Sequence, residues 1–239
     1  MAHRLYQQRR GRGTTTFRAT KKGKKSEYIT YDQQQKEDKK VGQVTRLLTD
    51  PQHYSILAEM KFDDKSKQLT IAAEGIQVGQ TIEYGKTANL ELGNVIPLGQ
   101  IIEGCPIFNI EKTPGDGGTL VKSSGLYSLI VTKDNKAVYV KMPSGKTIAF
   151  NHDCRATIGC AAGGGRKEKP FVKAGNKYHL MKAKSRKYAK NRGVAMNVVD
   201  HPHGGLQHHV GKSKSVSRHA SPGRKVGAIA SKRTGRRKK

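Results

Sequence analysis

The sequence is poor in cysteine and contains no long apolar run. Its 239 residues include only three cysteines, Cys105, Cys154 and Cys160. So few cysteines do not build a disulfide scaffold, and together with the missing signal peptide they indicate a reducing, cytoplasmic compartment. No apolar stretch approaches the roughly 20 residues that a membrane-spanning helix needs. We therefore expect neither a disulfide-rich secreted protein nor an integral membrane protein.

Acidic residues are almost missing from both ends of the chain. Residues 1–26 carry nine lysines and arginines and no acid. Residues 166–239 carry 22 basic residues against only Glu168 and Asp200, a net charge of +20. The middle, residues 27–165, has 15 basic and 16 acidic residues and a net charge of −1. The formal charge of +28 is therefore concentrated in two flanking segments.

The two flanks also lack the apolar clusters that a core requires. They are rich in glycine, lysine, arginine and serine, and such segments cannot offset the entropy of ordering. We expect extended basic arms whose partner is a polyanion, because this charge density attracts phosphates. A solvated, solubilising surface is the alternative. A membrane-surface role is disfavoured, since neither arm shows an amphipathic helical pattern with bulky apolar anchors.

The middle of the chain is predicted to be mostly β-structure. "KQLTIAAEG" alternates Leu69, Ile71 and Ala73 with polar neighbours, and "QTIEYG" places Ile82 and Tyr84 two residues apart. "LYSLIVTKDNKAVYVKMPSGKTIAF" predicts three short strands, because the sequences KDNK and PSGK are good turn formers. "ILAEMKF" fits either a short helix or a strand.

Many short strands with glycine and proline corners favour small barrels. About 140 residues exceed one five-stranded barrel and suit two. We place the division within residues 92–98, because "LGNVIPLG" interrupts the strand pattern.

From Gly159 onward the chain combines glycine, basic residues and aromatic rings. Gly163–Gly165 are consecutive, a basic residue then follows every two to four positions, and Phe171, Tyr178 and Tyr188 lie among them. Glycine lets the backbone approach a ligand closely, lysine and arginine meet phosphates, and rings stack on bases. A flexible linker would have the glycines without the rings, so we favour RNA contact here.

A protein-only metal site is not favoured. Cys154 and Cys160 have five residues between them, which is too many for common zinc motifs, and no second cysteine pair exists. His201, His203 and the pair at 208–209 surround a proline and two glycines, with no regular element to hold a tetrahedron. We interpret the cysteines as small buried residues of the barrels.

Nucleotide-binding and catalytic motifs are also incomplete. Gly211-Lys212-Ser213 and Gly145-Lys146-Thr147 match the end of a phosphate-binding loop, but Leu206 and Val140 stand where its first glycine is required. Asp200 beside His201 resembles a base and its orienting carboxylate, but adjacent residues rarely reach the required geometry and no nucleophile elbow frames a serine. We therefore expect no enzyme and no catalytic residue.

Residues 194–213, "VAMNVVDHPHGGLQHHVGKS", combine stiffness with unusual hydrogen-bonding groups. Pro202 fixes the backbone between His201 and His203, and two glycines follow. Imidazoles can hydrogen-bond phosphate, sugar hydroxyl or base edge. We interpret this stretch as an extended finger that folds against RNA and is not held by its own core.

At this loop the chain resembles a known family. "RGVAMNVVDHPHGG" at 192–205 is similar to the signature of large-subunit ribosomal protein two, a family found in all domains of life. "VGQTIEYGKTANLELGNVIPLG", "NIEKTPGDGG", "VKMPSGK", "CRATIG", "AGGGRKEKP", "KAGNKYH" and "PGRKVGAIASKRTGR" resemble further family blocks, in the family's order. The ends look archaeal or eukaryotic, with the archaeal type preferred. Val198 and Leu206 depart from the family's usual proline and glycine, and residues 27–40 match poorly.

The resemblance implies a mainly β fold, with an OB-fold barrel followed by an SH3-like barrel and long extended basic N- and C-terminal arms. It divides the chain into a basic extension, an OB-fold RNA-binding domain, an SH3-like barrel, and an extended basic rRNA-binding region that includes the 194–213 loop; the respective ranges are 1–36, 37–92, 93–165 and 166–239. It further implies a structural constituent of the large ribosomal subunit that supports assembly of the peptidyl transferase region, subunit association and tRNA binding. Peptide-bond chemistry in that region belongs to rRNA.

The resemblance and the clustering of basic residues together define a candidate rRNA-binding set: Arg9, Arg10, Arg12, Arg18, Arg155, Gly163, Gly164, Gly165, Arg166, Lys167, Lys169, Lys173, Lys177, His179, Lys182, Lys184, Arg192, Asn197, Lys212, Arg218, Arg224, Lys225, Arg233 and Arg236. The loop near the peptidyl transferase region is expected to contribute Asn197, Asp200, His201, His203, Gly204 and Gly205, with Asp200 and His201 on the family's Asp-His pair.

The expected partners are large-subunit rRNA and neighbouring ribosomal proteins, with the small subunit and tRNA contacted indirectly, and no membrane or small-molecule substrate. No cofactor is expected beyond Mg²⁺ associated with the rRNA. Two rivals are weighed against this interpretation. A metal- or nucleotide-dependent enzyme would bind stoichiometric zinc or ATP. A nonribosomal RNA chaperone could share the charge layout, but the ordered family blocks disfavour it.

Overall fold

A computed structural model of the chain describes residues 5–18, 23, 26, 32–205 and 208–235. The chain divides into two compact units, one of residues 22–170 and one that combines residues 1–21 with 171–239. Among the described residues, no helix is both long and apolar enough to cross a membrane.

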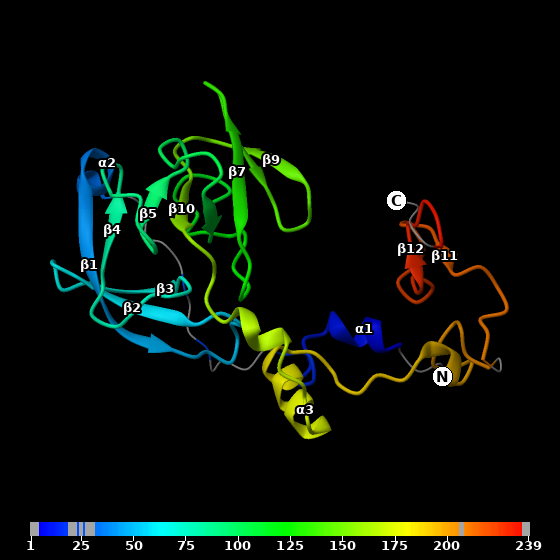
Figure 1. Ribbon diagram of the computed structural model, residues 1–239. Coiled ribbons are helices and arrows are strands. Elements are labelled where there is room, and N and C mark those ends of the chain that lie inside the picture. The colour runs from blue at the N-terminus through cyan, green and yellow to red at the C-terminus, as the bar shows by residue number, and fades with distance from the viewer. Residues whose placement is uncertain (1–4, 19–22, 24–25, 27–31, 206–207, 236–239) are drawn as a thin grey trace. The chain divides into compact units, whose positions relative to one another are not determined.

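The unit of residues 22–170 is built on one ten-stranded sheet (Figure 1). A short helix, α2 (Gln33–Glu37), precedes the sheet. The strands are β1 (Lys39–Leu48), β2 (Leu57–Phe62), β3 (Lys67–Ile71), β4 (Thr81–Gly85), β5 (Val95–Pro97), β6 (Pro106–Phe108), β7 (Ser128–Lys133), β8 (Val138–Lys141), β9 (Thr147–Phe150) and β10 (Arg155–Ile158). Their order across the sheet is β3-β2-β1-β4-β5-β10-β6-β7-β8-β9. In this order the strands β1 to β4 are neighbours at one end and the strands β5 to β10 are neighbours at the other, so the sheet has two halves that meet where β4 pairs with β5.

The first half is organised around the long strand β1, which pairs antiparallel with both β2 and β4. A register shift between Val44 and Arg46 lets this strand bend, as β-bulges do. Its core contains Val44 and Met60, together with Phe62 and Tyr84, whose rings meet edge to face at 5.3 Å. Burying these side chains is the main favourable term that closes the strands into a barrel.

The second half joins β10 to β5 and β6, and then continues through β7, β8 and β9 as antiparallel neighbours. Successive side chains of a strand point to opposite faces, so every second residue of β8 enters the core: Val138 and Val140 are buried, whereas Tyr139 and Lys141 face outward. A separate apolar cluster fills this half, and a smaller one around Phe108 lies beside both. The fold is therefore mainly β, with the OB-fold barrel followed by the SH3-like barrel that the sequence predicts.

Most strands expected from the sequence are confirmed. "KQLTIAAEG" contains β3, "QTIEYG" contains β4, the three strands with two turns are β7, β8 and β9, and "ILAEMKF" is the strand β2. The prediction that "LGNVIPLG" interrupts the strand pattern is wrong, because it contains β5. Val95 and Ile96 are both buried, so this short strand shows no polar alternation that would reveal it.

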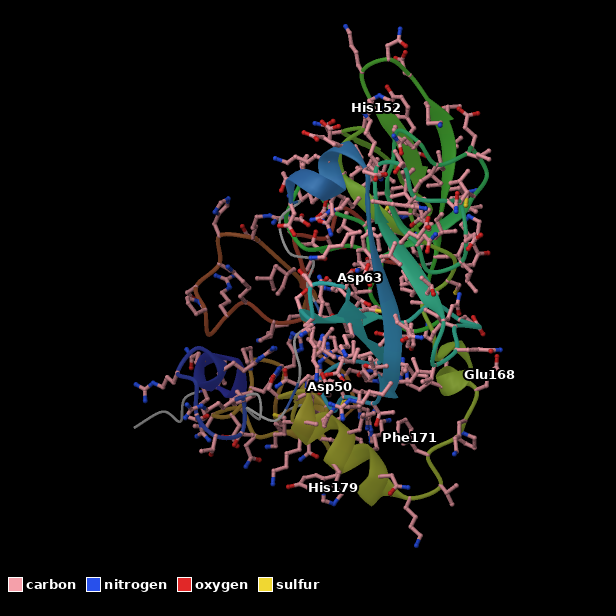
Figure 2. All side chains as sticks on the ribbon, turned by 90° about the vertical axis from the view of Figure 1, so that its left-hand side faces the viewer. Asp50, Asp63, His152, Glu168, Phe171 and His179 are labelled. Carbon is pink, nitrogen blue, oxygen red and sulfur yellow. The ribbon has the colours of Figure 1, made fainter. Side chains whose placement is uncertain are left out.

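The other unit contains little regular structure. Its elements are α1 (Tyr6–Arg10), α3 (Ala174–Ala183), a 3₁₀ turn at Gly193–Ala195, and the strands β11 (Ser215–Val216) and β12 (Ala228–Ile229), which pair in parallel. No residue of α3 is buried, and His179 projects from this helix (Figure 2). Among the described residues of this unit, Val210 and Val226 are buried, but neither belongs to one of the apolar core clusters. The sequence did not predict α3, because "AGNKYHLMKA" has no apolar stripe.

Candidate nucleic-acid interface

Most basic residues that the sequence assigns to RNA binding are exposed. The exposed members are Arg9, Arg10, Arg12, Arg18, Arg166, Lys167, Lys169, Lys173, His179, Lys182, Arg192, Lys212, Arg218, Arg224 and Arg233, and the half-buried ones are Lys177, Lys184 and Lys225. Arg236 lies outside the described residues. Because Glu168 and Asp200 are the only acids of residues 166–239, the segment cannot neutralise this charge by itself. An external anion is the natural counter-charge.

Arg155 is an exception, because the structure places it in the interior. Its side chain is 1% exposed, and its Nη2 lies 2.8 Å from Oε1 of Glu111. The Nε of Arg155 donates to the same oxygen at 3.1 Å, and its backbone N–H donates to Oε2 at 3.0 Å. Glu111 also accepts the N–H groups of Gly115 and Gly117. The guanidinium is neutralised inside the SH3-like barrel, so the structure corrects the prediction that Arg155 contacts rRNA.

The three consecutive glycines form a defined turn. Gly163 has a φ of +89° in the left-handed region, and the 3₁₀ helix Gly164–Lys167 follows it. Figure 2 shows Glu168 at the end of this turn. A Cβ added to Gly125 would lie only 2.6 Å from the Cα of Gly164, so glycine permits a close approach of two backbones. The structure brings the backbone of Gly125 against this turn, and the predicted RNA contact of the three glycines stays a prediction.

The stretch from Met196 to Gly205 is closed on itself by backbone hydrogen bonds. The carbonyl oxygen of Asn197 accepts the N–H groups of Asp200 and His201 at 3.0 and 3.2 Å. The N–H of Gly205 donates to the carbonyl oxygen of Met196 at 3.1 Å. The loop is therefore closed locally by backbone hydrogen bonds, and its contact with RNA stays a prediction.

Glycine is required where two backbone segments of this loop lie close together. A Cβ on Gly204 would collide with the carbonyl oxygens of Met196 and Asn197. Val198 and Val199 are 70% and 57% exposed at the tip, and Asp200 beside them is also exposed. Leu206 lies outside the described residues. The structure thus brings the predicted loop residues together and presents an apolar tip next to a carboxylate.

His201 has a fixed hydrogen-bonding role within the loop. Its Nδ1 accepts the backbone N–H of His203 at 3.0 Å, and the two imidazole rings meet edge to face at 5.1 Å. Its ring also packs against Gly193. Burial, and secondarily the neighbouring His203, lower the pKa of His201 from its ordinary value of 6.5. The lowered pKa favours the neutral form of the imidazole, and because Nδ1 accepts the N–H of His203, the proton of the neutral ring lies on Nε2.

Metal and nucleotide chemistry gain no support from the geometry. The described residues contain no group of three histidine, cysteine, aspartate or glutamate side chains that could hold a metal ion. Cys154 is buried, as predicted, and burial raises the pKa of its thiol to about 11, whereas Cys105 and Cys160 are half-buried. Gly145 lies in the turn between the antiparallel strands β8 and β9, which is not the strand-to-helix setting of a phosphate-binding loop.

Sequence reasoning did not find the residues that hold Arg166. Its Nε donates to Oγ of Ser124 at 3.2 Å, and its guanidinium carbon lies 3.9 Å from the ring centroid of Tyr54. These partners are 42 and 112 positions away along the chain. The run of basic residues after Gly165 indicated Arg166 as a binding residue, whereas no local sequence pattern indicates a role for Tyr54 or Ser124.

Two barrels with exposed, acid-poor cationic flanks define the chain as a nucleic-acid-binding β-protein. Two family models match it. The model "Ribosomal Proteins L2, RNA binding N-terminal domain" matches residues 2–84, and "Ribosomal Proteins L2, C-terminal domain" matches residues 91–224. The chain belongs to the ribosomal protein L2 family.

Curated relatives support the same family along the whole chain. "Large ribosomal subunit protein uL2" of Methanococcus maripaludis strain S2 is 52% identical over 240 residues, which cover 99% of this chain and 100% of that protein. The proteins of the same name from Methanosphaera stadtmanae and Methanothermobacter thermautotrophicus are 50% and 48% identical over 242 residues, with both chains fully covered. The resemblance to the archaeal type of the family is therefore confirmed.

Proposed function

We propose that this chain is a structural constituent of the large ribosomal subunit and binds large-subunit rRNA. The observation that carries the proposal is the match of both L2 domain models, one of them RNA-binding, along nearly the whole chain. The structure supports it with exposed basic residues in flanks that contain almost no acid. Basic side chains of this kind neutralise phosphates and fix the register of a protein on RNA.

The barrels and the flanks have different roles in this proposal. The two barrels, with a balanced charge, supply a rigid body. The exposed members of the rRNA-binding set, with Lys177, Lys184 and Lys225, meet phosphates where bulk cations would fit poorly, and Arg236 is proposed with them. The domain boundaries proposed are those of the sequence: 1–36, 37–92, 93–165 and 166–239.

The loop is proposed to lie near the peptidyl transferase region of the subunit. There it supports assembly of that region, subunit association and tRNA binding, together with neighbouring ribosomal proteins. Asn197, Asp200, His201, His203 and the two glycines after it position the loop rather than react. Peptide-bond formation is left to rRNA, so no side chain of this protein is catalytic. Any Mg²⁺ near Asp200 would belong to the rRNA.

The experiment is reconstitution of large subunits with His201→Ala. His201 lies in the unit of residues 171–239, so the barrels of residues 22–170 stay folded. Removal of the imidazole deletes the hydrogen bond that Nδ1 accepts and the donor at Nε2. We expect incorporation or peptide-bond-forming activity to fall roughly two- to tenfold, the value of about one net hydrogen bond.

The matched control for this experiment is His209→Ala. His209 is an exposed histidine of the same segment and takes no part in the backbone-closed loop. We expect it to behave like the wild type. Subunits that carry His201→Ala and remain fully active would remove His201 from the site, while leaving the rRNA-binding proposal intact.

A further inference from the structure

Three separate segments of the 22–170 unit meet at the glycine-rich turn. The backbone N–H of Gly125 donates to the carbonyl oxygen of Ala161 at 2.7 Å. The Oγ of Ser55 donates to the carbonyl oxygen of Lys122 at 3.1 Å. Together with the contact between Gly125 and Gly164, these bonds attach the turn and the residues around 54 and 124 to one rigid frame.

Arg166 is held on this frame through two different parts of its guanidinium. The Nε is bonded to Oγ of Ser124, a residue that is 2% exposed, and the flat face covers the half-buried ring of Tyr54 at 3.9 Å. A cation over an aromatic face is attracted by the ring's quadrupole. A side chain that normally samples many rotamers is therefore restricted before any ligand arrives.

The restricted guanidinium still presents its terminal amino groups. Arg166 is exposed, and the bond to Ser124 uses the Nε edge, which leaves the two η nitrogens for another partner. Those nitrogens form a planar fork that matches two oxygens of one phosphate, a geometry that a lysine ammonium cannot reproduce. Its neighbour Lys167 is exposed too, but no hydrogen bond or ring contact to its side chain is found in the described part of the chain.

We propose that Tyr54 and Ser124 preorganise Arg166 as a bidentate clamp for one backbone phosphate of large-subunit rRNA. This inference rests on the rRNA binding proposed above and assigns one contact within it. Preorganisation raises affinity because less rotamer entropy is lost on binding. Tyr54 and Ser124 are positioning residues, and Arg166 makes the contact. The contact reads phosphate, so it is independent of base sequence.

The test measures binding of the full-length chain to protein-free large-subunit rRNA from Methanococcus maripaludis over a series of salt concentrations. Arg166→Lys keeps the charge and loses the fork and the ring contact. We expect its affinity to fall about fivefold or more, while the slope of log affinity against log salt stays at the wild-type value. Arg166→Ala should lose affinity and also reduce that slope by about one.

The positioning residues are tested by three variants of their own. Tyr54→Phe keeps the ring and should bind like the wild type, whereas Tyr54→Leu and Ser124→Ala should each reproduce part of the loss of Arg166→Lys. The control is Lys136→Arg, which alters an exposed lysine between β7 and β8 that lies outside the candidate rRNA-binding set, and it should leave affinity unchanged. Circular dichroism and thermal unfolding of every variant establish that the barrels are intact.

The outcomes separate the two proposals. If the wild type binds this rRNA and Arg166→Lys binds equally well, Arg166 is an ordinary surface charge and the clamp is overturned while rRNA binding stands. If Arg166→Lys loses affinity only for rRNA fragments of one sequence, the contact reads a base and the phosphate assignment is overturned. If the wild type does not bind the rRNA even at low salt, the proposed function and the clamp both fail.

Discussion

At the scale of single residues, the loop histidines show how a sequence motif acquires a defined chemistry. The motif predicts imidazoles that can bond to RNA, and the structure adds that Nδ1 of His201 is already used by the N–H of His203. Only Nε2 is left for an outside partner, and it acts as a donor because the ring is neutral. The sequence around His201 could not predict this hydrogen bond, because the bond depends on the turn that Pro202 and Gly204 form.

We therefore predict that His201 titrates below 6.5, because burial and His203 lower its pKa. The unfolded loop binds a proton more readily than the folded one, so this contribution to stability is present above about pH 6.5 and is lost as the pH falls through the lowered pKa. ¹⁵N and ¹³C NMR of the imidazoles should show the Nε2–H tautomer at pH 7. His203→Ala should move the pKa of His201 upward.

An Nδ1–H tautomer at pH 7, or a titration of His201 above 6.5, would contradict the hydrogen bond described for the loop.

At the scale of elements, strands with a visible alternation such as β8 were predictable, whereas the short buried strands β5 and β10 and the long strand β1 were not predicted. β8 alternates Val138 and Val140 with outward residues, so its pattern identifies it. All four residues of β10 are buried, so its sequence has no alternation, and Arg155 within it was assigned to the rRNA-binding set. The missing information is tertiary: only the fold brings Glu111 to Arg155. The turn at Gly163 was partly predictable, because three glycines indicate close approach without naming the partner.

The Glu111–Arg155 pair gives the prediction at this scale. Glu111→Ala leaves the guanidinium of Arg155 buried without its carboxylate and frees the N–H groups of Gly115 and Gly117. Removal of one partner of a buried pair costs about 3–5 kcal/mol. Urea unfolding should therefore show a large loss in the free energy of unfolding. The control, Glu91→Ala, alters an exposed carboxylate and should unfold like the wild type.

If Glu111→Ala unfolded at the wild-type urea concentration, the ion pair would not tie the 111–117 segment to β10.

At the scale of the whole molecule, the division of charge predicted the architecture well. A middle with a net charge of −1 forms the barrels, and flanks with almost no acid carry the exposed cations. The sequence could not predict which of those cations would be held in place. Arg166 contacts Tyr54 and Ser124, whereas most of the others lie in the unit of residues 1–21 and 171–239, whose described residues contribute to none of the apolar core clusters. The distribution of charge can be predicted from the amino-acid composition of each segment. The restriction of one side chain cannot, because it depends on contacts between residues that are distant in the sequence.

Cosedimentation of the tagged chain with large ribosomal subunits, through a high-salt wash, tests the central claim most directly. A structural constituent has both phosphate contacts and a shaped body buried in rRNA, so it should remain in the large-subunit peak at one copy per subunit. A cationic protein held by charge alone is released as salt rises, because its phosphate contacts are exchanged for free cations. Quantitative release of the chain into the soluble fraction would contradict the account.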